Sequence, residues 1–355
     1  MSRAKRLGAV FVGVVVIALT ARWCVTRDDA AKKTEAKQAA ARPILVERNG
    51  KRTPSLPRTP KSSALTHTSN PDRKSSWGGG PDQLGRDRPS EGSASGPMSF
   101  TVGPGGAMYV LDQVNQRVVK IDAEGKRKTL PIASPTAQDL AIGEDGAMAV
   151  LDRFKGQDVA IFDDQGNPLG SIPLVGEGVE NPGLVTGVFV DGTDVYVEKE
   201  HATLTKIGST DGTAAEPRTD IPGRPTRDGK AYIKAGIIDA DAGRTYVAAN
   251  ARPGEEHLYT REINLDAPIL AIQLLDTDQL GQIYFATQVQ EDGEDVIVLV
   301  CLDQMTGAPQ GSAILPANTL PEESFRDLVV LDTGGVMMSI RSEDGVSYQF
   351  YDCDD

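Results

Sequence analysis

The residues whose types and spacing could support chemistry lie mainly in two short stretches of the chain. In the first, YVEKEHATL, Glu198 and Glu200 alternate on an extended segment and therefore point to the same side, beside His201. Two carboxylates and an imidazole can hold a divalent cation. The same residues also suit a polar hairpin turn, which is the interpretation that we favour here and for His257, which follows two glutamates.

The second stretch is a single polar turn that carries Asp112, Asn115 and Arg117. An asparagine in a turn can hydrogen-bond its own backbone and tolerate a left-handed conformation. Arginine can form a bidentate pair with the aspartate. We expect these residues to brace the turn, with Asp152 at the matching place in the next unit of the chain. The alternative is a polar binding patch on the face where such turns emerge.

Other motifs of metal or catalytic sites are incomplete or missing from the sequence. Asp239-Ala-Asp241-Ala-Gly243 resembles half a calcium loop, but Asn250 stands where the twelve-residue loop needs a glutamate, so we predict a hairpin turn. The three histidines of the chain are too scattered for a histidine-rich metal centre. No GxxxxGK[ST], GxSxG or HExxH motif occurs. We predict no cofactor, with calcium as the alternative, and we lean against an enzyme.

The elements that must position these residues repeat one unit, which is clearest over residues 98–131. Apolar residues alternate with polar ones at its start, a Gly-Pro-Gly-Gly turn follows, and the next strand, residues 107–111, is almost wholly apolar. A strand, a turn ending in glycine and a second apolar strand recur six times, and the marker glycines are Gly106, Gly146, Gly192, Gly243, Gly281 and Gly335. We therefore predict an all-β fold, a six-bladed β-propeller over residues 76–355.

In two units, the fourth and the sixth, the outer strand is not evident from the sequence. The sixth ends at Asp355 after three strands and would leave an open sheet edge, which residues 74–78 could cover, with Trp77 packed on the sixth blade. In the fourth unit, INLDAPI runs almost directly into the next inner strand, so its outer strand is the hardest to identify. Cys301 and Cys353 fall in third strands of adjacent units, where a disulfide and two free thiols are both open.

The first unit also carries a family resemblance. The pattern V-x-x-x-G-x-M-Y-V-x-D-x-x-N-x-R-V-x-x-I-x-x-x-G, from Val102 to Gly125, resembles an NHL repeat. The run from Trp77 to Phe100 is similar to the loop between blades in that family. The resemblance implies a six-bladed propeller of the NHL/TolB-like kind, in which the aspartate and arginine of this pattern brace a turn. In the third unit Lys199 replaces the aspartate.

The first 75 residues differ sharply in charge from the rest. They contain 16 Lys and Arg against 5 Asp and Glu, which leaves 21 against 45 for the remainder, from totals of 37 and 50. Residues 1–25 join a basic start to an apolar run, Leu7 to Ala21, which predicts a signal-anchor helix, with a cleaved signal peptide as the alternative. Residues 26–75 are basic and rich in Pro and Ser, which predicts a disordered linker. Positive charge before the apolar run predicts an inner-membrane anchor with the body in the periplasm or outside the cell.

Composition and architecture together favour a binding protein. The acidic body argues against nucleic acid as a partner. Rigid strands that hold variable turns on one face suit a protein or polymer partner. We therefore predict an exported, membrane-tethered, monomeric scaffold. A metal-dependent hydrolase or lyase with its site in the propeller funnel is the main alternative, and a sensor domain that acts with a separate membrane protein is a third.

Overall fold

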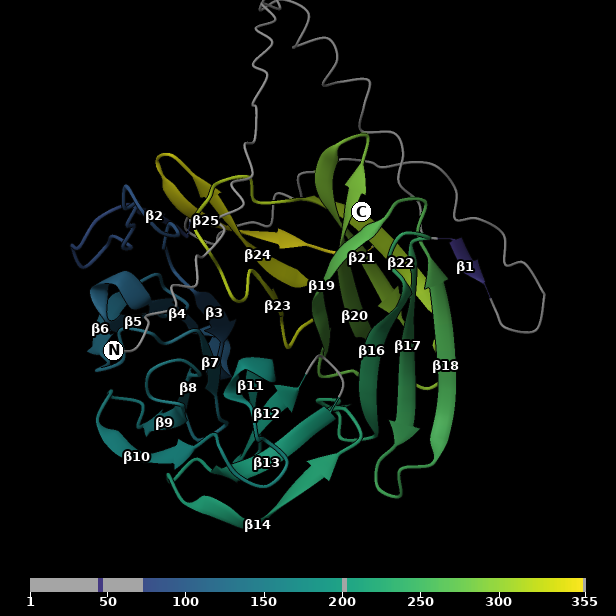
Figure 1. The fold of residues 1–355 in the computed structure, drawn as a ribbon, viewed down its shortest axis with the longest axis horizontal. Coiled ribbons are helices and arrows are strands. Elements are labelled where there is room, and N and C mark those ends of the chain that lie inside the picture. Colours follow the sequence, from purple (N-terminus) through teal and green to yellow (C-terminus); the bar gives the residue numbers. More distant parts are fainter. Residues whose placement is uncertain (1–43, 47–72, 200–202, 354–355) are drawn as a thin grey trace, which may run out of the picture. The chain divides into compact units, whose positions relative to one another are not determined.

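Six antiparallel sheets, the blades, surround a common centre in the computed structural model of the chain (Figure 1). The structure describes residues 44–46, 73–199 and 203–353, which belong to one unit from Ala41 to Asp355. The six-bladed all-β propeller that the sequence predicts is confirmed. The signal-anchor helix falls outside the described residues, as does most of the linker. No helix among the described residues has the length and apolar content needed to cross a membrane.

The first three blades each run outward from their inner strand in chain order. Blade 1 contains β3 (Ser99–Val102), β4 (Met108–Asp112), β5 (Arg117–Ile121) and β6 (Arg127–Pro131). Blade 2 contains β7 (Asp139–Ile142), β8 (Met148–Asp152), β9 (Asp158–Phe162) and β10 (Pro168–Pro173). Blade 3 contains β11 (Val185–Asp191), β12 (Asp194–Lys199), β13 (Thr203–Ser209) and β14 (Ala214–Ile221). Short 3₁₀ turns lie at η1 (Pro104–Gly106), η2 (Gln113–Asn115) and η3 (Pro182–Leu184).

The last three blades depart from this order in two places. Blade 4 contains β16 (Ala231–Asp239), β17 (Arg244–Ala251) and β18 (His257–Asn264), with β15 (Arg224–Pro225) inside and β1 (Ile44–Val46) outside. Blade 5 contains β19 (Ile269–Thr277), β20 (Ile283–Glu291), β21 (Glu294–Leu302) and β22 (Pro309–Pro316). Blade 6 contains β23 (Leu328–Val330), β24 (Val336–Ser342), β25 (Gly345–Tyr351) and β2 (Lys74–Ser76). Both exceptions recruit strands from the segment that precedes blade 1.

The six marker glycines are confirmed as turn residues between the inner and second strands of the blades. Each has a positive φ, between 62° and 89°, a region that a residue with a Cβ atom rarely adopts. The regular recurrence of glycine in the sequence therefore reports the backbone conformation of this turn in every blade.

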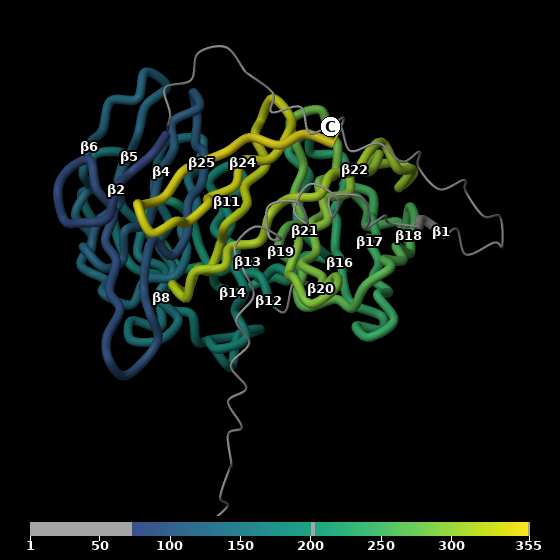
Figure 2. The backbone as a smooth tube through the Cα atoms, turned by 90° about the horizontal axis from the view of Figure 1, so that it is seen from above, coloured from purple at the N-terminus to yellow at the C-terminus, as the bar shows by residue number. Residues whose placement is uncertain are grey.

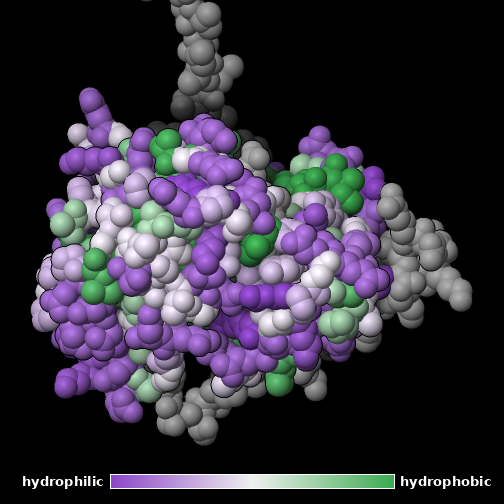
Figure 3. Space-filling view, turned by 90° about the horizontal axis from the view of Figure 1, so that it is seen from below, coloured by the Kyte–Doolittle hydropathy of each residue, from purple (hydrophilic) through white to green (hydrophobic). Residues whose placement is uncertain are grey.

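The core is divided into apolar clusters that lie between neighbouring blades. Five of the six interfaces hold such a cluster: 1–2, 2–3, 4–5, 5–6 and 6–1. Second strands contribute most because both of their faces are covered, as in β4 and β8, in which every residue is buried. No comparable cluster joins blades 3 and 4 among the described residues. The face seen in Figure 3 is mainly hydrophilic, with hydrophobic side chains in small separate groups.

The ring closes between the two ends of the propeller, as the sequence predicts. Strand β2 pairs antiparallel with β25, with Ser75 opposite Val346, and the two segments run side by side in Figure 2. Arg127 of blade 1 donates hydrogen bonds to Ser75 Oγ and to the Lys74 carbonyl oxygen, both at 2.8 Å. Trp77 packs on the cluster between blades 6 and 1. The edge that blade 6 would otherwise expose is therefore covered.

Candidate functional site

The centre of the ring is a cavity of about 1020 Å³. All six blades contribute to it, mainly through their inner strands and the turns that follow them. Its volume is that of a pocket for a small molecule. Its ionisable lining consists of four arginines and five acidic residues: Arg153, Arg224, Arg227, Arg326, Glu144, Asp191, Glu198, Asp276 and Asp332. The chemistry of the cavity therefore depends on how these charges are paired.

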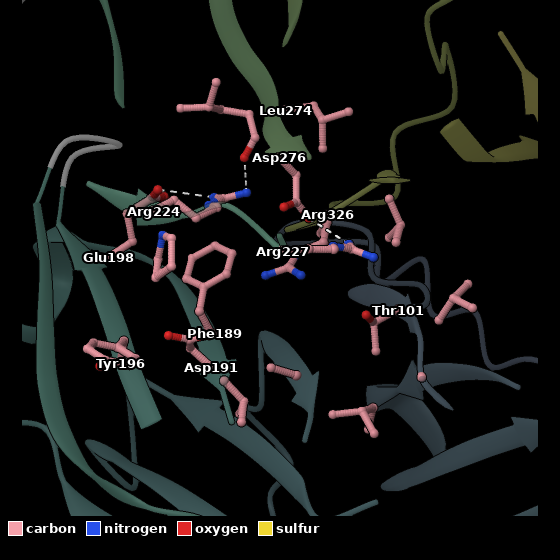
Figure 4. A pocket seen from close by; sticks show the side chains of 18 of the residues that line it. Thr101, Phe189, Asp191, Tyr196, Glu198, Arg224, Arg227, Leu274, Asp276 and Arg326 are labelled. Atoms are coloured by element: carbon pink, nitrogen blue, oxygen red, sulfur yellow. Dashed lines mark hydrogen bonds and ion pairs between the residues drawn. The ribbon is translucent and has the colours of Figure 1, made fainter. Parts of the chain in front are cut away.

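Two arginines, one in β15 and one just after it, reach from blade 4 to its neighbours. Arg224 lies 3.1 Å from Glu198 of blade 3 and also donates to the carbonyl oxygen of Leu275 in blade 5 (Figure 4). Arg227 lies 2.9 Å from Asp276 of blade 5 and also pairs with Asp332 near blade 6. Burial alone would raise the pKa of Asp276, but the charges of Arg227 and Arg224 bring this pKa below its usual value.

A third arginine spans the ring from the start of blade 6. Arg326 pairs with Asp139 at the start of β7 and donates to the carbonyl oxygen of Val188 in blade 3 at 3.3 Å. Asp139 is fully buried, and this burial raises its pKa against the opposing charge of Arg326. Blades 2, 3 and 6 are thereby joined through one guanidinium group.

Polar and cation–π contacts stand in for an apolar cluster at the interface of blades 3 and 4. The ring of Phe189 meets the guanidinium carbon of Arg224 at 3.8 Å and that of Arg326 at 5.3 Å from its centroid (Figure 4). Arg252 of blade 4 pairs with Asp191 of blade 3 at 2.8 Å. Several of these residues, Phe189, Asp191 and Arg224 among them, also line the cavity.

The fourth arginine of the cavity is bound differently. Arg153 donates through Nη1 to the carbonyl oxygens of Val185 (2.8 Å) and Gly183 (3.4 Å). Its guanidinium lies 5.2 Å from the ring centroid of Phe154 and 4.9 Å from that of Phe325. No carboxylate of the described residues forms an ion pair with it. Burial without such a partner lowers the pKa of Arg153, although the charge of Asp139 opposes the shift.

The structure confirms the bracing role of Asp112, Asn115 and Arg117. The Asp112 carboxylate accepts from Arg117 Nε at 2.7 Å, from Asn115 Nδ2 at 2.8 Å and from the backbone N–H of Gly85 at 2.9 Å. Arg117 also donates to the carbonyl oxygens of Gly80 and Gln83. The three residues therefore hold the loop behind Trp77 against blade 1, outside the lining of the central cavity.

The matching positions of blades 2 and 3 also hold loops. Asp152 accepts hydrogen bonds from the hydroxyls of Ser134 and Thr136 and from two backbone N–H groups of its own turn. Burial alone would raise the pKa of Asp152, but these hydrogen bonds bring it below its usual value. Lys199, which replaces the aspartate in blade 3, donates to the carbonyl oxygen of Gly178 at 2.7 Å. A cation thus performs the loop-holding role there.

Of the predicted cation-binding residues, the structure describes Glu198 but not Glu200 or His201. The side chain of Glu198 is buried in the cavity wall, where it is paired with Arg224 and accepts from Thr186 Oγ1 at 3.1 Å. Within the described residues, no three His, Cys, Asp or Glu side chains are grouped as metal ligands. Of the three residues in the predicted cation site, Glu198 therefore lies in the cavity wall, and the other two lie outside the described part of the chain.

The remaining predictions have clear outcomes. The segment with Asp239 is the turn between β16 and β17, in which the Asp239 carboxylate accepts from the N–H of Ala242, as predicted. His257 is exposed and contacts Thr260 Oγ1. The structure joins Cys301 and Cys353 in a disulfide, which resolves the alternative that the sequence left open.

Sequence reasoning missed the arginines of the cavity and Phe189. The only local signal was the pair Arg224 and Arg227 in a Pro- and Gly-rich segment between two strands, which reads as an ordinary loop. Their partners lie on other blades and could not be identified from spacing.

No protein-family model and no curated protein matches the chain. Solved structures that resemble it include hydrazine synthase from Kuenenia stuttgartiensis, with 16% identity, a TM-score of 0.49 and coverage of 73% of this chain and 77% of that chain. A streptogramin B lyase shows 12% identity, a TM-score of 0.40 and coverage of 75% and 97%. A gluconolactonase from Xanthomonas campestris shows 10% identity, a TM-score of 0.41 and coverage of 72% and 85%. Similarity at such low sequence identity concerns the fold alone, so the activities in these names are not assigned to this chain.

Proposed function

We propose that this chain is an exported, membrane-tethered β-propeller of NHL-like character that binds a protein or polymer partner as a monomer. The closed ring supports this role because six blades present their turns from a rigid framework. The basic segment before the ring would serve as the tether, and the apolar run from Leu7 to Ala21 as its membrane anchor.

The observation that carries the binding role is the pairing of charges in the cavity. Four of its five acidic residues are ion-paired with arginine, and the exception, Glu144, is exposed. A general acid or base must be able to exchange a proton with a substrate near neutral pH. Carboxylates paired with arginines are already engaged with the protein itself. The cavity is therefore better suited to recognition than to proton transfer.

The disulfide between Cys301 and Cys353 supports export. Disulfides persist in oxidising compartments such as the periplasm and are rare in the cytosol. The binding role needs no cofactor.

The proposal is tested in cells of the source organism with the full chain carrying a tag after Asp355. We expect the tag to be accessible from outside the inner membrane and the chain to stay with the membrane fraction. Cross-linking followed by capture should recover a partner, whereas a matched chain that begins at Arg73 should lose the membrane association. A tag protected within the cytosol would contradict export, and capture of no partner would contradict the binding role.

A metal-dependent hydrolase or lyase is the second candidate, favoured by the place of Glu198 in the cavity wall next to the Glu200 and His201 positions. Calorimetry with calcium, zinc and manganese separates the two. Tight binding that raises the melting temperature, and that is lost in Glu198→Gln, would support this candidate over the scaffold role.

A further inference from the structure

Arg153 differs from the other three arginines of the cavity in lacking a carboxylate partner among the described residues. Arg224, Arg227 and Arg326 are each matched with at least one buried or half-buried acid. Arg153 uses Nη1 for two carbonyl oxygens, while its Nε is buried with no acceptor and its Nη2 makes no hydrogen bond within the described structure. Nε is enclosed, so Nη2 is the donor left for an incoming anion, which a half-buried cation favours.

Arg153 lines the cavity, and two exposed apolar side chains lie close to it. The residue begins the turn between β8 and β9, and its guanidinium lies against Phe154, of which 62% is exposed. Leu184 of η3, next to the carbonyl oxygens that hold Arg153, is 47% exposed. A ligand bound to Arg153 would therefore find two accessible apolar side chains beside the guanidinium.

We propose that Arg153 binds the carboxylate of a ligand whose adjoining apolar group packs on Phe154 and Leu184. Arginine is suited to this task because its planar donors match the two oxygens of a carboxylate. The matching chemistry belongs to a free hydrophobic carboxylic acid and to the carboxyl terminus of a peptide that ends in an apolar residue. The inference gives a ligand chemistry to the proposed binding role and rests on that role.

Asp139 is the acidic residue whose charge acts on Arg153, but it is already paired with Arg326. Its carboxylate also receives the N–H of Val188. Arg153 therefore keeps its unused donors, and the ligand carboxylate would complete a fourth arginine–carboxylate pair in the cavity.

The test uses the full-length protein and isothermal titration with N-acetyl-leucine and N-acetyl-leucinamide, which differ only in the carboxylate. We expect the acid to bind with a Kd of ~1 mM or below and the amide to bind about tenfold or more weakly. Two tripeptides that end in leucine, as acid and as amide, form the second arm. Stronger binding of the peptide acid would identify a peptide terminus as the source, and stronger binding of the small acid would identify a free metabolite. Equal binding of acid and amide in both arms would overturn the proposal.

Variants locate the site. Arg153→Gln should abolish the preference for the acid, and Arg153→Lys should retain part of it, because lysine keeps the charge but not the planar donors. Lys155→Ala is the matched control, since it removes an exposed charge two residues away. An equal loss in Lys155→Ala would overturn the proposal. Phe154→Ala should reduce the advantage of N-acetyl-leucine over N-acetylglycine, and an unchanged advantage would remove the apolar contact from the proposal.

Two features keep this test decisive. If Arg153→Gln fails to fold, the comparison of acid with amide on the unmodified protein and the Arg153→Lys variant still decide the outcome. Cellular capture of a partner does not depend on these titrations. A chain that captures a partner but does not distinguish acid from amide would therefore refute this inference alone.

Discussion

The indole Nε1 of Trp77 donates a hydrogen bond to the carbonyl oxygen of Ser342 at 2.9 Å, across 265 positions of the chain. Ser342 ends β24, and Trp77 directly follows β2, the outer strand of the same blade. The guanidinium of Arg86 lies 5.0 Å from the centroid of the Trp77 ring. The segment that closes the ring is therefore fixed by side-chain contacts as well as by strand pairing.

Removing this segment should destabilise the propeller. A chain that begins at Pro81 lacks β2 and Trp77, whereas a control chain that begins at Arg73 keeps both, and neither contains β1. We expect the shorter chain to melt roughly 10 °C lower, because several kcal/mol are lost and each shifts the melting temperature of a large domain by about 2–4 °C. The exposed edge of β25 should also promote aggregation, measured by light scattering. This closure would be refuted if both chains melted at the same temperature and both remained monomeric.

The brace at Asp112 should be one of the costliest single positions in blade 1. Asp112→Ala leaves Arg117, itself largely buried, without its carboxylate and frees the Gly85 N–H. Breaking a buried pair in this way costs about 3–5 kcal/mol. Urea unfolding measures the loss, and Glu124→Ala, an exposed acid in the same blade, should change stability by less than about 0.5 kcal/mol. Similar losses of stability in the two variants would show that the Asp112–Arg117 pair does not stabilise blade 1.

These two sites show what local sequence can predict. Asp112 and Arg117 are five positions apart and face each other across one turn, so their residue types are enough to predict the ion pair. The marker glycines announce the blades in the same way, because each fixes a turn between adjacent strands. The sixth unit lacks an outer strand, and the residues just before blade 1 can supply it, which predicts the place of Trp77.

The cavity could not be predicted in this way because its contacts are set by the closed ring. Arg326 and Asp139 are 187 positions apart, and each looks unremarkable in its own segment. Arg224 meets Glu198 only because β15 turns inward at the interface of blades 3 and 4. The chain is acidic overall, but the cavity gathers four arginines. The net charge of the chain therefore does not predict which charged side chains line the central cavity.

Stability should fall in acid through Glu322. Burial alone would raise the pKa of Glu322, but the hydrogen bond and charge of Arg88 bring this pKa below its usual value. The folded state therefore gains stability above the unfolded pKa of about 4.3 and loses it as the pH falls through the lower folded pKa. Glu322→Gln should cost about 1–3 kcal/mol at pH 7, with the deficit shrinking toward pH 3.

Urea unfolding at pH 7, 5, 4 and 3 follows this dependence. Glu323→Gln is the matched control, because the neighbouring side chain is exposed and should show no such difference at any pH. A deficit in Glu322→Gln that stays constant down to pH 3 would show that the ionised pair with Arg88 is not its cause.

The disulfide should contribute to stability by restraining the unfolded chain. Cys301 and Cys353 enclose a separation of 52 residues, for which the loop-entropy relation gives about 4 kcal/mol. Reduction should lower the melting temperature, and the double variant Cys301→Ala/Cys353→Ala should melt near the reduced protein and be insensitive to reductant. Thiol titration of the unfolded, unreduced full chain should find one thiol of three cysteines, Cys24. Three reactive thiols would exclude the bridge.

The outer strand of blade 4 comes from far along the chain, which explains why the sequence offered no strand after INLDAPI. Strand β1 pairs antiparallel with β18, with Val46 opposite Glu262. In a Cys24→Ser background, Val46→Cys/Glu262→Cys should form a cross-link under mild oxidation, since directly opposed residues on paired strands lie close enough for a disulfide. Val46→Cys/Thr260→Cys, displaced by two residues along the same strand, should cross-link far less. Peptide mapping without reduction identifies the product. Equal yields from the two pairs, or none from either, would show that residues 44–46 do not complete this blade in solution.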